Sequence, residues 1–171
     1  MNKDPIEGRI KKLLETERLF ESMFNDCPVP CWHKVYDKRS DKFFMDIVND
    51  AYTEATGITV EAYQGQSDPM LWEDSTAAIF HKNDSHVFRT RVVLPIEERI
   101  NNPMTGTEQY AVGWKWPIVS GRSLTGIWGM ANMFEKEMWE AARPTNPFYK
   151  KNAVILDKRW IELYGEPNAQ K

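Results

Sequence analysis

The stretch that decides the fold runs from Phe44 to Asp68 and reads FMDIVNDAYTEATGITVEAYQGQSD. It begins as a hydrophobic strand-like run and continues, after Asn49, as two short helical pieces separated by Gly57. Gly65 and the Ser-Asp pair that follows add another turn signal soon afterwards. A helix that packs into a core normally runs longer than these pieces. The pattern therefore indicates several short helices in place of one long core helix.

The segments on either side of this stretch predict strands and longer helices. An amphipathic helix pattern covers residues 5–24, and a hairpin of two strands is expected at 28–36 and 43–48. Downstream, a helix pattern at 75–88 precedes three alternating runs, which predict an antiparallel meander at 90–100, 109–120 and 123–134. This order predicts an α+β fold, with a five-stranded antiparallel sheet and short helices inserted between strands two and three.

Composition narrows the class of protein. The 171 residues carry a net charge of −3 and are 42% hydrophobic, which predicts a globular domain with a sizeable core. Basic residues are scattered, so we expect no direct nucleic-acid binding. We find neither a signal-peptide pattern nor an apolar run of the roughly 20 residues that span a membrane, and expect a cytoplasmic protein without membrane contact. Cys27, Cys31 and His33 are one ligand short of a closed zinc site, so no metal is expected.

The element order and three stretches resemble a PAS domain. The stretch quoted above resembles the family's second strand, the Asn after it, and its short helices. HKNDSHVFRTRVVLPIEE (residues 81–98) resembles the long connecting helix and third strand, and VGWKWPIVSGRSLTGIWGMANMFEKE (residues 112–137) resembles the last two strands and the exit helix. The resemblance covers roughly residues 19–140. It implies a PAS fold in which short helices enclose a cavity over one face of the sheet.

This resemblance suggests three parts of the chain and a place for a ligand. We expect an N-terminal dimerisation helix (1–24), a PAS domain (25–140), and a C-terminal tail with a short helix (141–171). Side chains alternate between the two faces along the last two strands. The resemblance implies which face is the inner one, and on that face lie small residues and Lys115, which should point toward the cavity. The candidate pocket residues are Phe44, Asn49, Tyr52, Tyr63, Trp72, Phe80, Phe88, Gly113, Lys115, Gly129 and Ala131. The large aromatic residues among them could instead fill the cavity. Lys115 could bind an anionic ligand or pair with a carboxylate such as Asp46 or Glu97.

The opposite face of the sheet carries large apolar side chains. Such a patch is expected to be covered by the N-terminal helix, by a second subunit, or by both, which predicts a homodimer. The candidate interface residues are Ile6, Ile10, Leu13, Phe20, Trp114, Trp116, Trp128 and Met130, and Tyr110 lies on the same face.

The resemblance also bears on cofactors. The segment at 65–71, GQSDPML, lacks the cysteine with which light-oxygen-voltage PAS domains attach flavin, so flavin is not expected. The haem alternative would use His81 or His86 on the connecting helix. We recognise no catalytic motif and expect no enzyme activity. The usual D-I-T at the end of the last strand is replaced by Met133, Phe134 and Glu135, which puts the family's coupling contact in doubt.

The function expected from this resemblance is that of a sensory and signalling module. It would bind a small molecule in the cavity and signal through homodimer or partner contacts. The alternative is a ligand-free dimerisation or interaction platform with a filled core. A small enzyme using Lys115 and His81 in the same cavity is a third reading. The identity of the ligand, the pathway and the downstream partner does not follow from the sequence.

Overall fold

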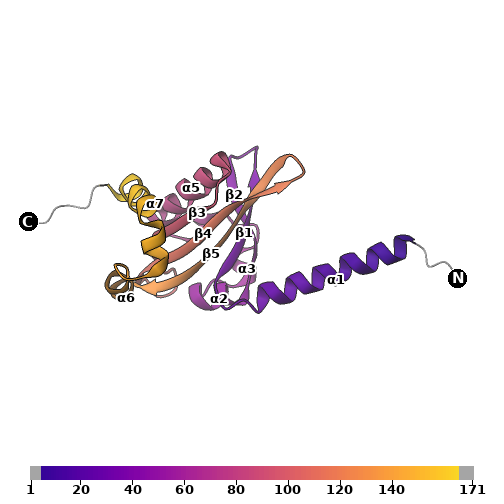
Figure 1. The fold of residues 1–171 in the computed structure, drawn as a ribbon, viewed down its shortest axis with the longest axis horizontal. Coiled ribbons are helices and arrows are strands. Elements are labelled where there is room, and N and C mark those ends of the chain that lie inside the picture. The colour runs from indigo at the N-terminus through magenta and orange to yellow at the C-terminus, as the bar shows by residue number, and fades with distance from the viewer. Residues whose placement is uncertain (1–4, 166–171) are drawn as a thin grey trace, which may run out of the picture.

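The computed structural model describes residues 5–165 and contains one five-stranded antiparallel sheet (Figure 1). Its order, β2-β1-β5-β4-β3, places the first hairpin beside the last strand of the chain. The strands are β1 (Cys31–Asp37), β2 (Lys42–Val48), β3 (Leu94–Asn101), β4 (Glu108–Ser120) and β5 (Ser123–Glu135). This confirms the predicted α+β fold with a five-stranded antiparallel sheet.

Short helices cover the inner face of the sheet, between β2 and β3 in sequence. They are α2 (Asp50–Thr56), α3 (Val60–Tyr63), α4 (Asp68–Leu71) and the longer α5 (Asp74–Thr90). Helix α2 stops after two turns because Gly57 adopts a left-handed conformation, φ 70°, and donates its N–H to the Thr53 carbonyl. The glycine thus explains the early break seen in the sequence.

Asn49 ties three elements together at the end of β2. Its Oδ1 accepts from the backbone N–H of Tyr52, which caps α2, and from that of Cys31, which begins β1. Its Nδ2 donates to the carbonyl of Phe24 in the last turn of α1 and to that of Val29 on the segment that links α1 to the sheet. Asn49 is 1% exposed and uses its whole amide in this way. Its amide therefore binds the backbone, and Asn49, a predicted pocket residue, does not line the core cavity.

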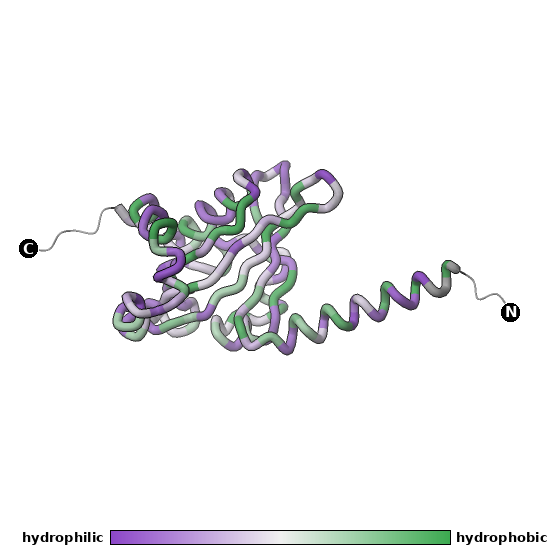
Figure 2. The backbone as a smooth tube through the Cα atoms, viewed as in Figure 1, coloured by the Kyte–Doolittle hydropathy of each residue, from purple (hydrophilic) through white to green (hydrophobic). Residues whose placement is uncertain are grey.

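The main core lies between the sheet and the short helices. Its members come from all five strands and from α2, α3 and α5, including Trp32, Tyr52, Phe80, Ile96 and Ile127. Hydrophobic residues alternate with polar ones along much of the chain, as expected when each element buries only one face (Figure 2). This core positions the functional site described below.

The terminal helices lie at opposite ends of the domain. Helix α1 (Pro5–Asn25) projects away from the sheet, whereas α6 (Lys136–Ala142) and α7 (Pro147–Tyr164) lie at the other end (Figure 1). The tail was predicted to hold a short helix near its end, but α7 already begins at Pro147. Asn146 caps it by accepting from the Phe148 N–H, and Pro147 suits the first helical turn. None of the helices in residues 5–165 is long and apolar enough to cross a membrane.

Candidate functional site

A small closed cavity lies in the core between the sheet and the short helices. Its volume is about 20 Å³, which is room for about one water molecule. Charged side chains and aromatic rings share its wall, an uncommon combination in a protein core. The lining residues are Trp32, Lys34, Tyr52, Asp68, Trp72, Phe80, Glu98, Ala111, Lys115 and Met133.

Five charged residues form one buried cluster beside this cavity. Asp84 on α5 lies between two lysines: Lys34 Nζ donates to its Oδ2 at 2.8 Å, and Lys115 Nζ is 2.7 Å from its Oδ1. Lys34 also binds Asp68 Oδ2 at 2.7 Å, and Lys115 also binds Glu98 Oε1 at 2.6 Å. None of the five is more than 5% exposed. The name "ion cluster" refers below to Lys34, Asp68, Asp84, Glu98 and Lys115.

The carboxylates of the ion cluster have different electrostatic surroundings. The pKa of Asp84 is lowered because its two lysine partners outweigh the largest single influence, burial, which acts in the opposite direction. The pKa of Asp68 is raised, chiefly by burial and also by the nearby Asp84 charge, although Lys34 opposes the shift. Of these two carboxylates, Asp84 therefore holds its negative charge more firmly and Asp68 takes up a proton more readily.

Three carboxylate oxygens of the ion cluster have no hydrogen-bond partner among the described residues, and one of them, Asp84 Oδ1, still forms an ion pair with Lys115. Asp68 Oδ1 and Glu98 Oε2 are buried and have no hydrogen-bond partner within residues 5–165. Leaving a buried carboxylate oxygen unpaired is costly, typically by 1–3 kcal/mol or more. Both residues line the cavity. The wall therefore offers two hydrogen-bond acceptors, and one donor at Nε1 of Trp72, to a molecule that enters the cavity.

Trp32 fills much of the space that small residues leave on the sheet. It lies opposite Gly129 in the β1–β5 pairing, and Gly129 lies opposite Lys115 in the β4–β5 pairing. A Cβ at position 129 would come within 2.3 Å of the Trp32 ring. Gly129 thus makes room for Trp32, whose ring lies 5.9 Å from Lys115 Nζ. The small residues expected to create a large pocket instead accommodate an indole that the sequence had not indicated.

A chain of hydrogen bonds connects the ion cluster to the C-terminal helix. Glu98 Oε1, which binds Lys115, also accepts from Asn83 Nδ2 at 2.8 Å. Asn83 Oδ1 in turn accepts from Arg159 Nε on α7 at 3.2 Å. One turn further along α7, Tyr164 accepts at its hydroxyl from the Arg99 N–H of edge strand β3. We call Lys115–Glu98–Asn83–Arg159 the "polar relay".

Only part of the predicted pocket lines the cavity. Tyr52, Trp72, Phe80 and Lys115 lie on its wall. Other predicted residues belong to the surrounding core without lining the cavity: Tyr63, Phe88 and Ala131. Gly113 and Gly129 contribute to packing, since a Cβ at Gly113 would lie 2.0 Å from the Met130 carbonyl oxygen. Phe44 is half-buried, while its neighbour Phe43 is in the core, because successive side chains of a strand point to opposite faces.

Lys115 does point inward, but its partners differ from those suggested. Glu97 lies on the opposite face of β3 and accepts from Trp139 Nε1 and Arg143 Nε. Asp46 is exposed on β2 and pairs with His33 Nδ1 at 2.8 Å. Glu98 and Asp84 pair with Lys115 instead. A long-range pairing of this kind has no signature in the local sequence.

The two histidines of the haem alternative lie away from the cavity. Both line an open groove of about 420 Å³ between α5 and α7, together with Arg89 and Arg159. Lys115 and His81 therefore do not meet in the cavity as the enzyme reading required. The Cys27 and Cys31 sulfur atoms lie 3.9 Å apart, while His33 turns to Asp46.

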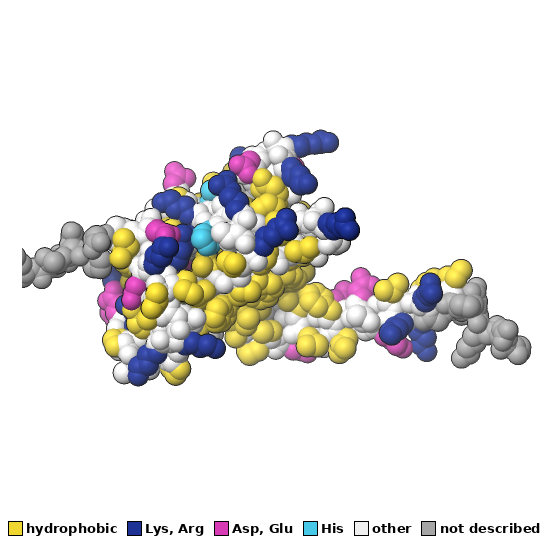
Figure 3. Space-filling model, turned by 45° about the horizontal axis from the view of Figure 1, so that its top comes forward, with side chains coloured by type: hydrophobic (Ala, Val, Ile, Leu, Met, Phe, Trp, Pro, Cys, Tyr) yellow, Lys and Arg dark blue, Asp and Glu magenta, His cyan; other side chains and the backbone are white. Residues whose placement is uncertain are grey.

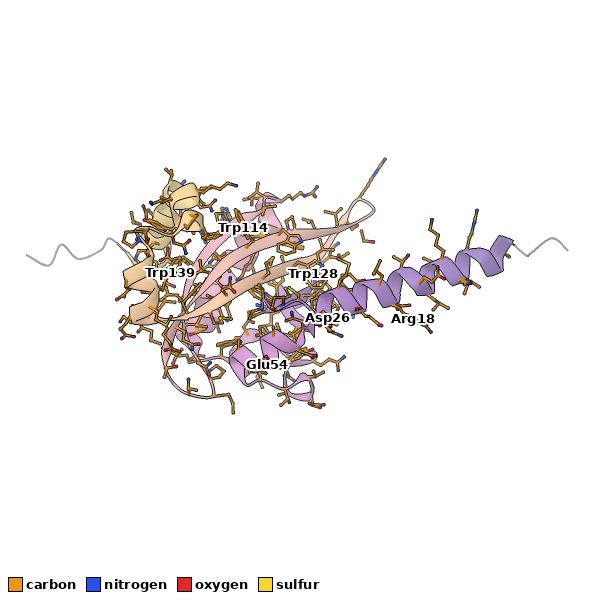
Figure 4. All side chains as sticks on the ribbon, turned by 60° about the horizontal axis from the view of Figure 1, so that its bottom comes forward. Arg18, Asp26, Glu54, Trp114, Trp128 and Trp139 are labelled. Atoms are coloured by element: carbon orange, nitrogen blue, oxygen red, sulfur yellow. The ribbon has the colours of Figure 1, made fainter. Side chains whose placement is uncertain are left out.

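Half of the outer sheet face is covered by the C-terminal helices. Tyr110 stacks on Trp160 of α7, and Phe134 stacks on Trp139 of α6. This corrects the expectation that only the N-terminal helix or a second subunit would cover the face. The four predicted interface residues of the sheet are half-buried: Trp114, Trp116, Trp128 and Met130. Trp114 contacts Phe148 of α7, whereas Trp128 contacts α1. Figure 4 shows Trp114 and Trp128 on this face, with Trp128 beside the end of α1.

Asp84 and Asp68 are predicted to respond differently to loss of charge. Asp84→Asn removes the carboxylate between two buried lysines and should lower the free energy of unfolding by about 3–5 kcal/mol at pH 7. Asp68→Asn leaves Lys34 paired with Asp84 and should cost about 1 kcal/mol or less. Urea unfolding at pH 7 measures both values. Equal losses in the two variants would contradict the central role of Asp84.

Asp84 and Asp68 should contribute to the free energy of unfolding with opposite pH dependence. The lowered pKa of Asp84 gives stability that is present above its ordinary value of 3.8 and is lost as pH falls. The raised pKa of Asp68 acts in reverse, because ionising it costs stability as pH rises from 3.8 through its folded-state value. Relative to the wild type, Asp68→Asn should therefore gain stability as pH rises over that interval.

The polar relay predicts that α7 loosens when Arg159 is replaced. Arg159→Met keeps most of the aliphatic stem but removes the contact with Asn83, so amide hydrogen exchange should accelerate in α7 more than in the sheet. Lys158→Met is the matched control, because Lys158 is the exposed neighbour on the same helix. If both variants exchange alike, the relay does not hold α7.

Several solved structures have a fold similar to that of this chain. The PAS domain of BvgS from Bordetella pertussis matches with a TM-score of 0.56 and 18% identity, over 80% of this chain and 98% of that one. The PAS domain of an HTR-like protein from Haloarcula marismortui matches with a TM-score of 0.57 and 16% identity, over 75% and 99%. VqmA of Vibrio cholerae, in a complex with ligand and DNA, matches with a TM-score of 0.52 and 21% identity, over 69% and 50%.

The sequence matches no protein-family model, and a comparison with curated proteins finds no match. The comparisons therefore bear on the fold alone. The five-stranded antiparallel sheet with short helices over its inner face is the part of the chain that carries this similarity to the two solved PAS domains. This chain folds as a PAS domain.

Proposed function

We propose that this chain is a PAS-type sensory module that binds a small molecule in its core cavity and passes the signal through a homodimer or a protein partner. The observation that carries the proposal is the incompletely paired, charged wall of the cavity. Asp68 Oδ1 and Glu98 Oε2 lack partners among the described residues, and a bound molecule would satisfy them. A purely structural core would gain stability from apolar side chains of similar volume at these positions.

The size of the cavity limits the ligand. At about 20 Å³ the space holds one water, whereas sites for larger molecules measure several hundred Å³. A ligand of a few non-hydrogen atoms would have to displace the short helices α2 to α4 slightly. These helices have only four to seven residues each, so they open at lower cost than the sheet. The VqmA structure, which holds a ligand, is consistent with this use of the fold.

A ligand-free platform is the second candidate function. It is favoured by Trp32, which packs against Gly129 and already fills the space beside Lys115. In that case the ion cluster would specify the fold and the module would work through its surfaces alone. Both candidates share the same dimer contacts and differ in whether the cavity is ever occupied.

The homodimer is proposed from apolar side chains on α1 and the nearby sheet. Leu13 and Met23 are 68% and 67% exposed on a helix that projects from the domain. Phe20 packs on Phe24, and both rings contact Trp128 at the edge of the outer face. Hydrophobic side chains form a continuous patch across the middle of Figure 3, next to the end of α1. A second copy that lays its α1 on this patch would cover both surfaces.

The polar relay offers a route from the cavity to α7. A ligand that pulls on Glu98 would disturb Asn83 and hence Arg159. Helix α7 could then change its contact with the edge strand β3 or with a downstream protein. We also place the module in the cytoplasm, since Cys27 and Cys31 are free thiols with sulfur atoms only 3.9 Å apart.

Native mass spectrometry of the freshly purified protein tests the ligand. We expect a dimer that carries an additional small non-covalent mass, which is absent under denaturing conditions. Ala111→Leu should remove the additional mass while the dimer persists, because Ala111 lies on the cavity wall, where a larger side chain would fill the space, and outside the α1 contacts. A dimer without any such mass, also after soaking in a metabolite library, would leave the platform as the function.

Substitutions on α1 test the proposed dimer contact. Leu13→Ser together with Met23→Ser should convert the dimer to a monomer in sedimentation velocity, with little change in unfolding free energy of the domain, since both side chains are exposed. Val154→Ser on α7 is the matched control, as an exposed apolar residue on another helix. Dimers of undiminished affinity in the double variant would refute an α1 interface.

A further inference from the structure

We propose that the ligand of the core cavity is a small organic monocation of the primary alkylammonium class, anchored by Asp68 and Glu98. This inference rests on the proposed function and names the chemistry of its ligand. It is carried by three features of the cavity wall: the charge balance of the ion cluster, the kind of hydrogen-bonding atoms left unpaired, and the aromatic rings around them.

The ion cluster is one positive charge short. Its three carboxylates, Asp68, Asp84 and Glu98, face two ammonium groups, Lys34 and Lys115, so the fully ionised cluster has a net charge of −1. The guanidinium of Arg159 binds the Asn83 amide and an exposed glutamate, and does not reach these carboxylates. A net charge buried this deeply is unfavourable. A bound monocation would bring the cluster to neutrality.

Two of the three side-chain atoms on the wall that lack a partner within residues 5–165 are acceptors, and the third is a donor, Nε1 of Trp72. Within the described residues, Asp68 Oδ1 and Glu98 Oε2 have no donor. Each lysine, in contrast, already contacts two carboxylates: Lys34 binds Asp68 and Asp84, and Lys115 binds Asp84 and Glu98. An anionic ligand would have to compete with these carboxylates for the lysines. An ammonium group, with three N–H donors, fits the oxygens that are free.

Aromatic rings complete the wall. Trp32, Tyr52, Trp72 and Phe80 line the cavity, and Phe80 already has the two lysine nitrogens at 5.2 and 5.0 Å from its ring centre. The faces of such rings attract cations and their edges pack against alkyl groups. An ion with both an ammonium head and a short alkyl chain uses both properties, whereas a bare metal ion uses only the first.

Asp68 also gives the cavity a connection to the surface. The same residue lines an open groove of about 430 Å³ together with Lys42, Pro69 and His81. It therefore stands between the groove and the cavity, held by one bond to Lys34. Movement of the four-residue helix α4, which begins at Asp68, would open a path between them. A cation entering there would meet a carboxylate first.

A matched set of probes tests this inference by thermal unfolding of the full chain at pH 7. Propylammonium chloride at about 50 mM should raise Tm by about 2–4 °C relative to sodium chloride at equal concentration, since binding to the native state stabilises it by mass action. Propan-1-ol has the same number of non-hydrogen atoms and no charge, and should give no rise. Sodium acetate and potassium chloride should likewise give none.

Two variants locate the effect. Asp68→Asn removes the extra negative charge and one anchor, so the rise with propylammonium should be lost. Glu54→Gln makes the same change of net charge at an exposed position on α2 (Figure 4) and should keep the full rise. The wild-type comparison of propylammonium with propan-1-ol decides the question even if Asp68→Asn does not fold.

Other results would overturn the inference in distinguishable ways. A rise with acetate or propan-1-ol but not with propylammonium would show a ligand of another class and leave the proposed function standing. An equal rise with potassium would point to an inorganic ion. A rise that persists in Asp68→Asn would place the binding elsewhere. No rise with any probe, together with no additional mass in the native spectrum, would overturn the small-molecule function itself.

Discussion

The carboxylate of Asp84 is the interaction on which the rest of the structure depends. It lies between Lys34 and Lys115 and thereby joins α5 to β1 and β4, two strands that are not neighbours in the sheet. Buried charges are tolerated only when they are paired with good geometry. Asp84 provides that pairing for both lysines at once. Without it, two ammonium groups would face each other in an aromatic core, and neither the inner face nor the cavity would keep its present form.

The ion cluster also connects the core to the C-terminal helix α7. Glu98 accepts from Lys115 on one side and from Asn83 on the other, and Asn83 receives Arg159 from α7. A helix that is last in the sequence is therefore bound to the centre of the core. The outer face is divided between this C-terminal unit, which covers Tyr110, and the apolar patch near α1. The cavity, the C-terminal helix and the exposed patch thus all lie against one sheet.

Local chemistry allowed much of the fold to be predicted. Gly57 ends α2 because its left-handed conformation is favourable only for glycine, and this preference can be read directly from the sequence. Alternation in β4 correctly placed Lys115 on the inner face and Tyr110 on the outer one. The prediction for Phe44 was wrong by one residue: Phe43, and not Phe44, points into the core, so the alternation along β2 is shifted by one position. In the tail, Asn146 and Pro147 start a helix earlier than the short helix that was expected there.

By itself, the sequence determined the order of the elements, the early end of α2 and the inward direction of Lys115, because each depends on neighbours a few residues away. Only the tertiary structure decided which side chains pair with one another. Lys34 and Asp84 are 50 positions apart, and Asn83 and Arg159 are 76 positions apart. Charged residues are frequent along the chain, so no spacing indicates which of them meet. Trp32 occupies the space beside Gly129 because β1 pairs with β5, a contact set by the closure of the whole sheet.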